Sequence, residues 1–144
     1  MSDVWAGIAG EFLHLYPASG RLVAVAGPDA DRSAAVADEL AGALRAAGQT
    51  VERAHTADGD EQRLRDGVIA GFRADVRTDR VLIVSGPANL LSKSARGLWN
   101  FTLWHLVGDE PPQTAASALV DVTDPAHPVR VWADFCAVPT GYGS

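Results

Sequence analysis

The chain has 144 residues, of which 47% are hydrophobic and 21% are charged, and its formal net charge is -6. This composition is typical of one globular domain, expected here to span residues 1–144, and it excludes a disordered chain. An acidic chain lacks the basic surface that a phosphate backbone requires, so we expect no nucleic-acid partner. No apolar run approaches the roughly 20 residues of a membrane span, the N-terminus has no basic start typical of a signal peptide, and the single cysteine forms no internal disulfide. We therefore expect a cytoplasmic protein without a membrane partner.

The N-terminal segment 1–17 predicts an amphipathic helix over residues 3–15. Trp5, Ile8, Phe12 and Leu15 recur at spacings of three and four, and Pro17 follows. We expect this helix to pack on the rest of the fold as an extra element.

The stretch from Arg21 to Gly48 predicts a strand, a turn and a long helix. Residues 21–26 are apolar without alternation, which indicates a strand buried on both faces. A helical pattern follows over residues 32–47, and Gly48 is expected to end it.

The remaining elements alternate in the same way. A second strand is expected at 50–54, then a helix at 61–76 with the apolar stripe Leu64, Val68, Phe72 and Val76. Further strands are expected at 80–85, 101–107, 118–122 and 129–135, with a short helical segment at 88–96.

This alternation predicts a three-layer α/β fold with a mainly parallel five-stranded sheet. The last two strands lie too close for a helical crossover, so we expect an antiparallel C-terminal hairpin strand. The core would cover residues 20–135, and residues 136–144 would form a tail.

Three stretches resemble the uridine-kinase-like P-loop kinases, in order and over most of residues 20–134. VAVAGPDADRSAAVADELAGALRAAG is similar to the opening strand, phosphate loop and helix of that family. RVLIVSGPANLLSKSARGLWNFTLWHLV is similar to the part that holds its second acidic motif, and SALVDVTDPAHPVRVW to its closing strand and hairpin. The resemblance implies a sheet of P-loop-kinase type.

It also implies a site for phosphate or another ligand, made of Gly27, Pro28, Asp29, Asp31, Arg32, Ser33, Ser85 and Gly86. The chemistry of these residues departs from the GxxxxGK[ST] pattern, in which glycine N–H groups surround the phosphates and a lysine reaches them. The turn is one residue short and lacks its second glycine, and Arg32 stands in place of the lysine. Asp29 and Asp31 oppose a polyphosphate, and either of them equally well predicts a helix cap.

Two further parts of a kinase are missing. The third strand ends in Ser85-Gly86-Pro87, where the family has a carboxylate that holds Mg²⁺. The loop over residues 109–116 has no basic residue, where the family has a lid with arginines. Loss of one transition-state cation costs about 10³ to 10⁵ in rate, so efficient phosphoryl transfer is not expected.

Asp58 and His55 are the candidate catalytic residues, because both follow the second strand. The resemblance implies that Asp58 is a general base, whereas the Asp-Gly sequence also predicts a plain turn. His105, inside the fourth strand, is interpreted as a buried, hydrogen-bonded imidazole. Four scattered histidines and one cysteine show no ligand spacing, so neither a metal site nor a cofactor is expected.

Four functional hypotheses remain open. The favoured one is a non-catalytic P-loop-kinase-like domain that binds a small molecule or a protein partner. The chain is alternatively an enzyme that uses Asp58 and His55 for other acid/base chemistry, or a residual nucleoside kinase that binds nucleotide with Mg²⁺ through Arg32. A homo-oligomer through Trp132 and the C-terminal hairpin edge is the fourth.

Overall fold

A computed structural model of the chain describes residues 4–17, 20–74 and 80–131, and its strands form one sheet. In spatial order the strands are β2 (Thr50–His55), β3 (Arg80–Pro87), β1 (Arg21–Gly27), β4 (Phe101–Leu106), β5 (Ala118–Asp121) and β6 (Val129–Val131). The first five strands are mutually parallel and β6 is antiparallel to β5. The predicted α/β sheet with an antiparallel C-terminal strand is confirmed. Trp132, the rest of that predicted strand and the predicted tail at 136–144 lie outside the described residues.

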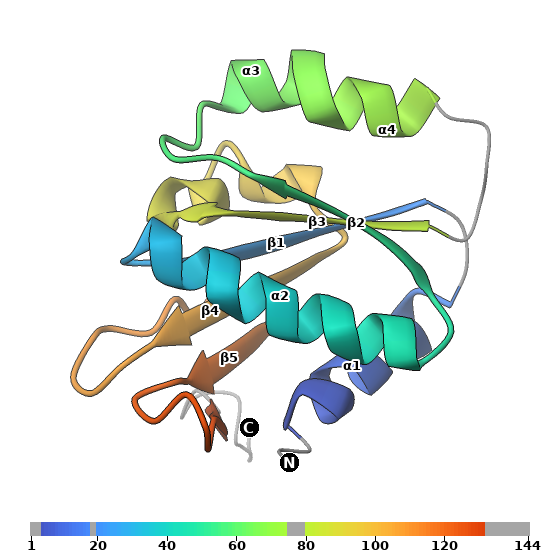
Figure 1. Cartoon of the computed structure of the whole chain (residues 1–144). Coiled ribbons are helices and arrows are strands. Elements are labelled where there is room, and N and C mark those ends of the chain that lie inside the picture. Colours follow the sequence, from blue (N-terminus) through green and yellow to red (C-terminus); the bar gives the residue numbers. More distant parts are fainter. Residues whose placement is uncertain (1–3, 18–19, 75–79, 132–144) are drawn as a thin grey trace.

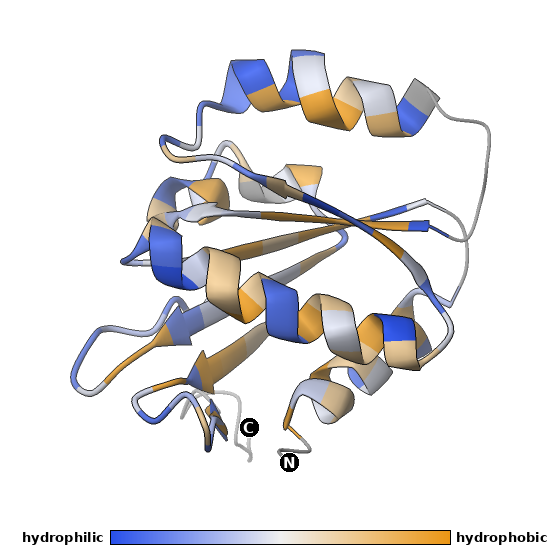
Figure 2. Cartoon of the chain, in the orientation of Figure 1, coloured by the Kyte–Doolittle hydropathy of each residue, from blue (hydrophilic) through white to orange (hydrophobic). Residues whose placement is uncertain are grey.

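The central strand β1 is buried along its whole length, as its continuous apolar sequence predicts. Val23 and Val25 belong to one hydrophobic cluster, whereas Leu22, Ala24 and Ala26 belong to another. Alternate side chains of a strand point to opposite faces, so the sheet has a core on each side. Figure 2 shows the matching pattern, with hydrophobic strands inside and hydrophilic residues on the outer helices.

Helices α1 (Val4–Leu15) and α2 (Ala30–Ala46) cover the face of the sheet that holds Val23 and Val25 (Figure 1). The predicted extra N-terminal helix therefore exists and packs on α2. Gly48 follows the end of α2 with a φ of +89°, and its N–H bonds to the carbonyl of Arg45 at 2.9 Å. A residue in this left-handed conformation ends a helix, which confirms the predicted stop.

The opposite face is covered by α3 (Glu61–Leu64), η1 (Arg65–Ile69) and α4 (Ala70–Ala74). The predicted helix is present over the described residues 61–74, but it is not regular throughout, because η1 is a π-helical turn. The wider turn adds one residue, so the core contacts fall on Leu64, Ile69 and Phe72, and Val68 is only half-buried. Val76, the last residue of the predicted stripe, lies outside the described residues.

The segment after β3 also differs from its prediction. The short helical segment predicted over 88–96 is not continuous, and consists of two 3-10 turns, η2 (Ala88–Leu91) and η3 (Arg96–Leu98). Its buried leucines belong to the same cluster as Leu22, so this crossover and the one through α2 lie on opposite faces of the sheet. Neighbouring strands β1 and β3 therefore end at a topological switch point, which is where open α/β sheets bind ligands.

Candidate functional site at the carboxyl edge of the sheet

The turn between β1 and α2 consists of two residues, Pro28 and Asp29. Asp29 is the N-cap of the helix, and its Oδ1 accepts hydrogen bonds from the backbone N–H of Asp31 at 2.9 Å and of Arg32 at 3.2 Å. These N–H groups are among those that a helix N-terminus offers to an anion. An internal carboxylate already uses them, and the exposed Asp31 adds a second negative charge beside them.

Gly27, at the end of β1, lies directly against the imidazole of His105 from β4. A Cβ built on Gly27 would overlap three atoms of the His105 ring. His105 has no exposed surface and lies on the same face as Phe101 and Leu103, as predicted. The glycine at the first position of the sequence motif therefore makes room for a side chain of the protein itself.

A directed chain of hydrogen bonds surrounds this imidazole. Arg32 Nε donates to His105 Nδ1 at 3.0 Å, so Nδ1 is the unprotonated nitrogen and Nε2 carries the hydrogen. His105 Nε2 then donates to Ser33 Oγ at 2.6 Å, and Ser33 Oγ donates to the carbonyl of Asp29 at 3.2 Å. Burial, reinforced by the charge of Arg32, lowers the pKa of His105 to about 4, which keeps the ring neutral near pH 7.

Glu110, from the loop after β4, completes this network. Its Oε1 accepts from Arg32 Nη2 at 2.6 Å and from the backbone N–H of Val107 at 2.8 Å. The Arg32 guanidinium holds the pKa of Glu110 below its ordinary value, and the Val107 N–H adds to this effect. Arg32, the only cation of the predicted phosphate site, thus forms an ion pair within the chain.

The polarity of the network decides what it can do chemically. A serine nucleophile needs an imidazole nitrogen that accepts its proton, and that imidazole is normally oriented by a carboxylate. Here His105 donates to Ser33, and an arginine instead of a carboxylate orients the ring. Ser33 is fully buried as well. This arrangement stabilises the junction of β1, β4 and α2, and it does not activate Ser33.

At the end of β3, Ser85 and Gly86 lie next to β1, with Gly86 opposite Ala26 in the parallel register. Ser85 is fully buried, and its Oγ lies 2.7 Å from Nδ1 of the exposed His55 on the neighbouring strand β2. A Cβ on Gly86 would lie 3.0 Å or less from Thr56 and Leu90. The hydrogen bond of Ser85 and the close contacts of Gly86 thus involve β2, its following loop and η2.

Asp58 is held in the loop that follows β2. Its Oδ1 accepts from the Asp60 N–H at 3.0 Å and from Thr56 Oγ1 at 3.2 Å, and its Oδ2 pairs with Arg63 at 3.1 Å. The Asp60 N–H is the largest influence that lowers the pKa of Asp58. Asn89, from η2, donates to the carbonyl of Asp58 at 2.8 Å and so ties this loop to the end of β3.

Asp58 and His55 line one pocket of about 370 Å³ at the carboxyl end of β2. Its wall is the segment from Asp60 to Val68, including Gly67 and Val68 of the π-helical turn. A Cβ on Gly67 would meet nothing within 4 Å. The π-helical turn thus forms part of the pocket wall, and turns of this kind are frequent at functional sites.

The structure thus divides the predicted site residues into two groups. Gly27, Arg32 and Ser33 belong to the network around His105, whereas His55 and Asp58 belong to the pocket at the end of β2. The sequence did not identify Glu110 or Asn89, because their partners lie 78 and 31 positions away. The only feature of the sequence that pointed to Glu110 was the acidic character of the loop at 109–116.

Neither a protein-family model, nor a curated protein, nor a solved structure matches this chain. Within residues 4–17, 20–74 and 80–131, no three His, Cys, Asp or Glu side chains are grouped to hold a metal ion. In the same ranges, no helix has the length and apolar character of a membrane span.

Proposed function

We propose that this chain is a P-loop-kinase-like domain that no longer transfers phosphate and that acts by binding a small molecule or a protein partner. The resemblance over residues 20–134 supports descent from a P-loop kinase, and the network around His105 supports the loss of phosphoryl transfer. The observation that carries the proposal is the ion pair of 2.6 Å between Arg32 and Glu110. In this ion pair, Arg32, the one cation that a residual kinase would need, is already bound to the carboxylate of Glu110.

The cost of reversing this arrangement supports the same conclusion. A nucleotide phosphate at this position has to displace the Glu110 carboxylate from Arg32 and the Asp29 carboxylate from the helix N–H groups. It also requires the space that the His105 ring fills above Gly27. Each of these exchanges breaks a hydrogen bond to a charged group that is already formed within the chain.

The pocket at the end of β2 supports the binding role. It lies at the carboxyl edge, has a volume within the usual range for small-molecule sites, and combines the apolar Leu64 and Val68 with the polar His55, Asp58 and Arg63. Asp58, Asp60 and Arg63 together carry one net negative charge. A neutral or cationic small molecule therefore fits this pocket better than a phosphorylated one.

The kinase part of the proposal is tested by calorimetry with Mg²⁺-ATP and Mg²⁺-GTP and by an assay for release of the γ-phosphate. We expect no binding at millimolar nucleotide and no turnover above the rate in buffer. Turnover that disappears in Arg32→Ala would overturn the proposal and favour the residual nucleoside kinase.

The binding part is tested by a thermal-shift screen with nucleosides, sugars, amines and inorganic anions. For any compound that binds at the end of β2, Gly67→Leu is expected to abolish the shift, since Gly67 lines the pocket and its Cβ position is open. Gly71→Leu is the matched control, because Gly71 also has open space beside it but does not line the pocket.

A second candidate is an enzyme that uses Asp58 and His55 for acid/base chemistry, which is favoured by their place in one pocket. The lowered pKa of Asp58 counts against it, because a general base works best with a pKa near the operating pH. If the screen yields a compound that the chain converts, Asp58→Asn tests this candidate: full activity in this variant eliminates Asp58 as the acid/base group.

A further inference from the structure

A groove separate from the carboxyl edge runs between α1, α2 and the turn that joins β5 to β6. It consists of two adjoining hollows of about 550 Å³ and about 110 Å³, which share Trp5, Glu39 and Pro125. Its other walls are mainly small or apolar residues, among them Gly42, Ala43, Ala126 and Pro128. Small side chains allow a bound backbone to approach closely. We call this surface the α1–α2 groove.

Trp5 is the first feature of this groove that points to a ligand. Only 8% of the residue is exposed, but its indole N–H remains open to solvent and has no hydrogen-bond partner among the described residues. The other two tryptophans of the described residues are bonded: Trp99 Nε1 donates to the Leu90 carbonyl at 2.9 Å, and Trp104 Nε1 donates to the Pro111 carbonyl at 3.2 Å. Of these three donors, the Trp5 N–H is the one left open to an occupant of the groove.

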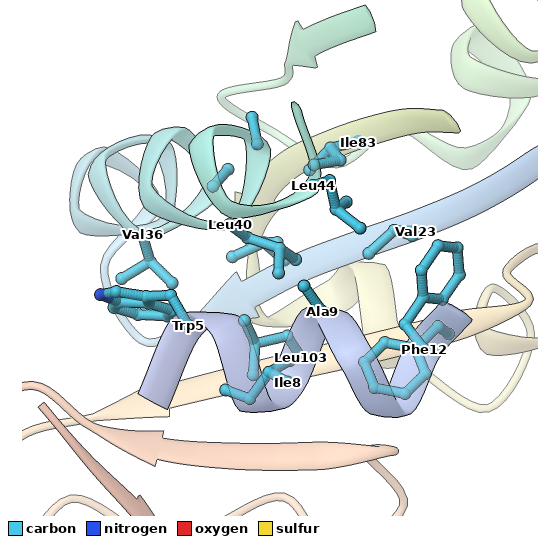
Figure 3. Close-up of a cluster of buried hydrophobic side chains, with 14 of the residues drawn as sticks. Trp5, Ile8, Ala9, Phe12, Val23, Val36, Leu40, Leu44, Ile83 and Leu103 are labelled. Atoms are coloured by element: carbon cyan, nitrogen blue, oxygen red, sulfur yellow. The ribbon is translucent and has the colours of Figure 1, made fainter. Parts of the chain in front are cut away.

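The orientation of Trp5 agrees with an external acceptor. Figure 3 shows the indole beside Val36, with its nitrogen at the end of the ring farthest from Ala9 and Leu40. The ring lines both hollows of the groove. A ligand carbonyl in the groove would therefore complete the hydrogen bonding of Trp5.

Glu39 is the second feature. Three charged residues of α2 lie along the groove, and two of them are paired: Arg32 with Glu110 at 2.6 Å, and Asp38 with Arg53 at 3.1 Å. Glu39 is exposed, lines both hollows and has no partner within the described part of the chain. The groove thus presents one donor at Trp5 and one unpaired negative charge at Glu39.

We propose that the α1–α2 groove binds a basic segment of a partner protein. A main-chain carbonyl of that segment accepts from Trp5 Nε1, and a lysine or arginine side chain pairs with Glu39. Small apolar side chains of the segment rest on Gly42, Ala43 and Pro125. This inference rests on the proposed binding role and specifies a protein partner for it, at a surface that the nucleotide experiments do not involve.

Charge decides among the possible occupants. Residues 132–144 contain no lysine, arginine or histidine, and they include Asp134, so this segment of the chain does not complement Glu39. A second copy of the chain has a net charge of -6 and meets the groove with like charge. A basic partner instead gains from the same charge, which attracts it over distances of about a Debye length.

The test uses the full-length ¹⁵N-labelled chain and the peptide acetyl-Ala-Ala-Arg-Ala-Ala-amide. The Trp5 indole resonance is identified by its absence in Trp5→Phe. We expect the Arg peptide to shift this resonance and the amides of Glu39, Gly42 and Ala43, whereas the same peptide with neutral citrulline, or with glutamate, shifts them several-fold less at equal concentration.

Two variants connect the binding to the named groups. Glu39→Gln is expected to weaken the Arg peptide about threefold and Trp5→Phe about fivefold, the losses typical of one exposed ion pair and one hydrogen bond. Asp31→Asn is the matched control, because it removes one charge from the same helix outside the groove, and it should leave the affinity unchanged. Equal binding of the citrulline peptide, an unchanged affinity in Glu39→Gln, or no shift of the Trp5 resonance overturns the inference.

Discussion

Arg32 Nε donates a hydrogen bond to His105 Nδ1 at 3.0 Å across 73 positions of sequence. This one contact fixes the tautomer of the imidazole, the role of Ser33 as an acceptor and the position of the ring over Gly27. The segment from Gly27 to Ser33, which resembles a phosphate loop in sequence, is therefore a packed junction between β1, α2 and β4.

The burial of His105 predicts that the free energy of unfolding falls as the pH drops from 6.5 to about 4. In this window the unfolded chain binds one more proton than the folded chain, because burial and Arg32 lower the pKa of the folded imidazole from 6.5 to about 4. The contribution of His105 to the free energy of unfolding is fully present above pH 6.5, and it decreases by about 3 kcal/mol as the pH approaches 4.

Urea unfolding at several pH values measures this slope. His105→Gln is expected to have a lower stability at pH 7 and a flatter dependence between pH 6.5 and 5.5, above the range in which most carboxylates titrate. Parallel curves for the two proteins would contradict the prediction.

Gly27→Ala is predicted to destabilise the fold by about 1 to 3 kcal/mol, the usual cost of overpacking a core. Its Cβ would overlap the His105 ring. Gly42→Ala is the control, since the new Cβ meets nothing within 4 Å and alanine favours the helix, so it should stabilise by about 0.5 to 1 kcal/mol. Chemical unfolding measures both. In a chain that already carries His105→Ala, Gly27→Ala should cost clearly less, and an undiminished cost would show that the ring is not the obstacle.

Asp29→Ala is predicted to cost about 1 kcal/mol of stability through loss of the α2 N-cap. Asp29→Asn keeps an oxygen acceptor and should cost only a few tenths of this amount. Asp31→Ala, two residues further on and inside α2, removes a charge near the same helix end but no cap, and its effect should stay within about 0.5 kcal/mol. Equal losses for Asp29→Ala and Asp31→Ala in thermal unfolding would assign the effect to charge alone.

Deletion of Gly67 is predicted to convert the π-helical turn into regular α-helix. Ile69 would then follow Leu64 at a spacing of four and Phe72 would follow three residues later, which restores one apolar stripe. We expect stability to change by less than about 1 kcal/mol and the pocket beside His55 to lose its ligands.

Circular dichroism with urea unfolding measures the first effect, and the thermal-shift screen measures the second. Deletion of Gly71 is the control, because it moves Phe72 off the stripe and should cost about 2 kcal/mol or more. A loss of that size from the Gly67 deletion would mean that the fold itself requires the wider turn.

The sequence determined the sheet, the helices α1 and α2 and the antiparallel C-terminal strand. The physical reason is that β1 and α2 carry strong, regular patterns: an unbroken apolar run, a stripe at helical spacing and a glycine stop. Over 61–76 the regular spacing of the apolar residues predicted one stripe through Val68. The π-helical turn adds one residue to the helix, so Ile69 lies in the core in place of Val68.

The tertiary structure alone decided how the polar residues combine. The sequence placed Arg32 and Ser33 at a helix start, and His55 and Asp58 after a strand, but periodicity has no information on which loop supplies Glu110 or what fills the space above Gly27. Those contacts join residues 72 to 78 positions apart and depend on the order of strands in the sheet. Local pattern specifies elements because their hydrogen bonds are local, whereas a site is specified by the packing that brings distant elements together.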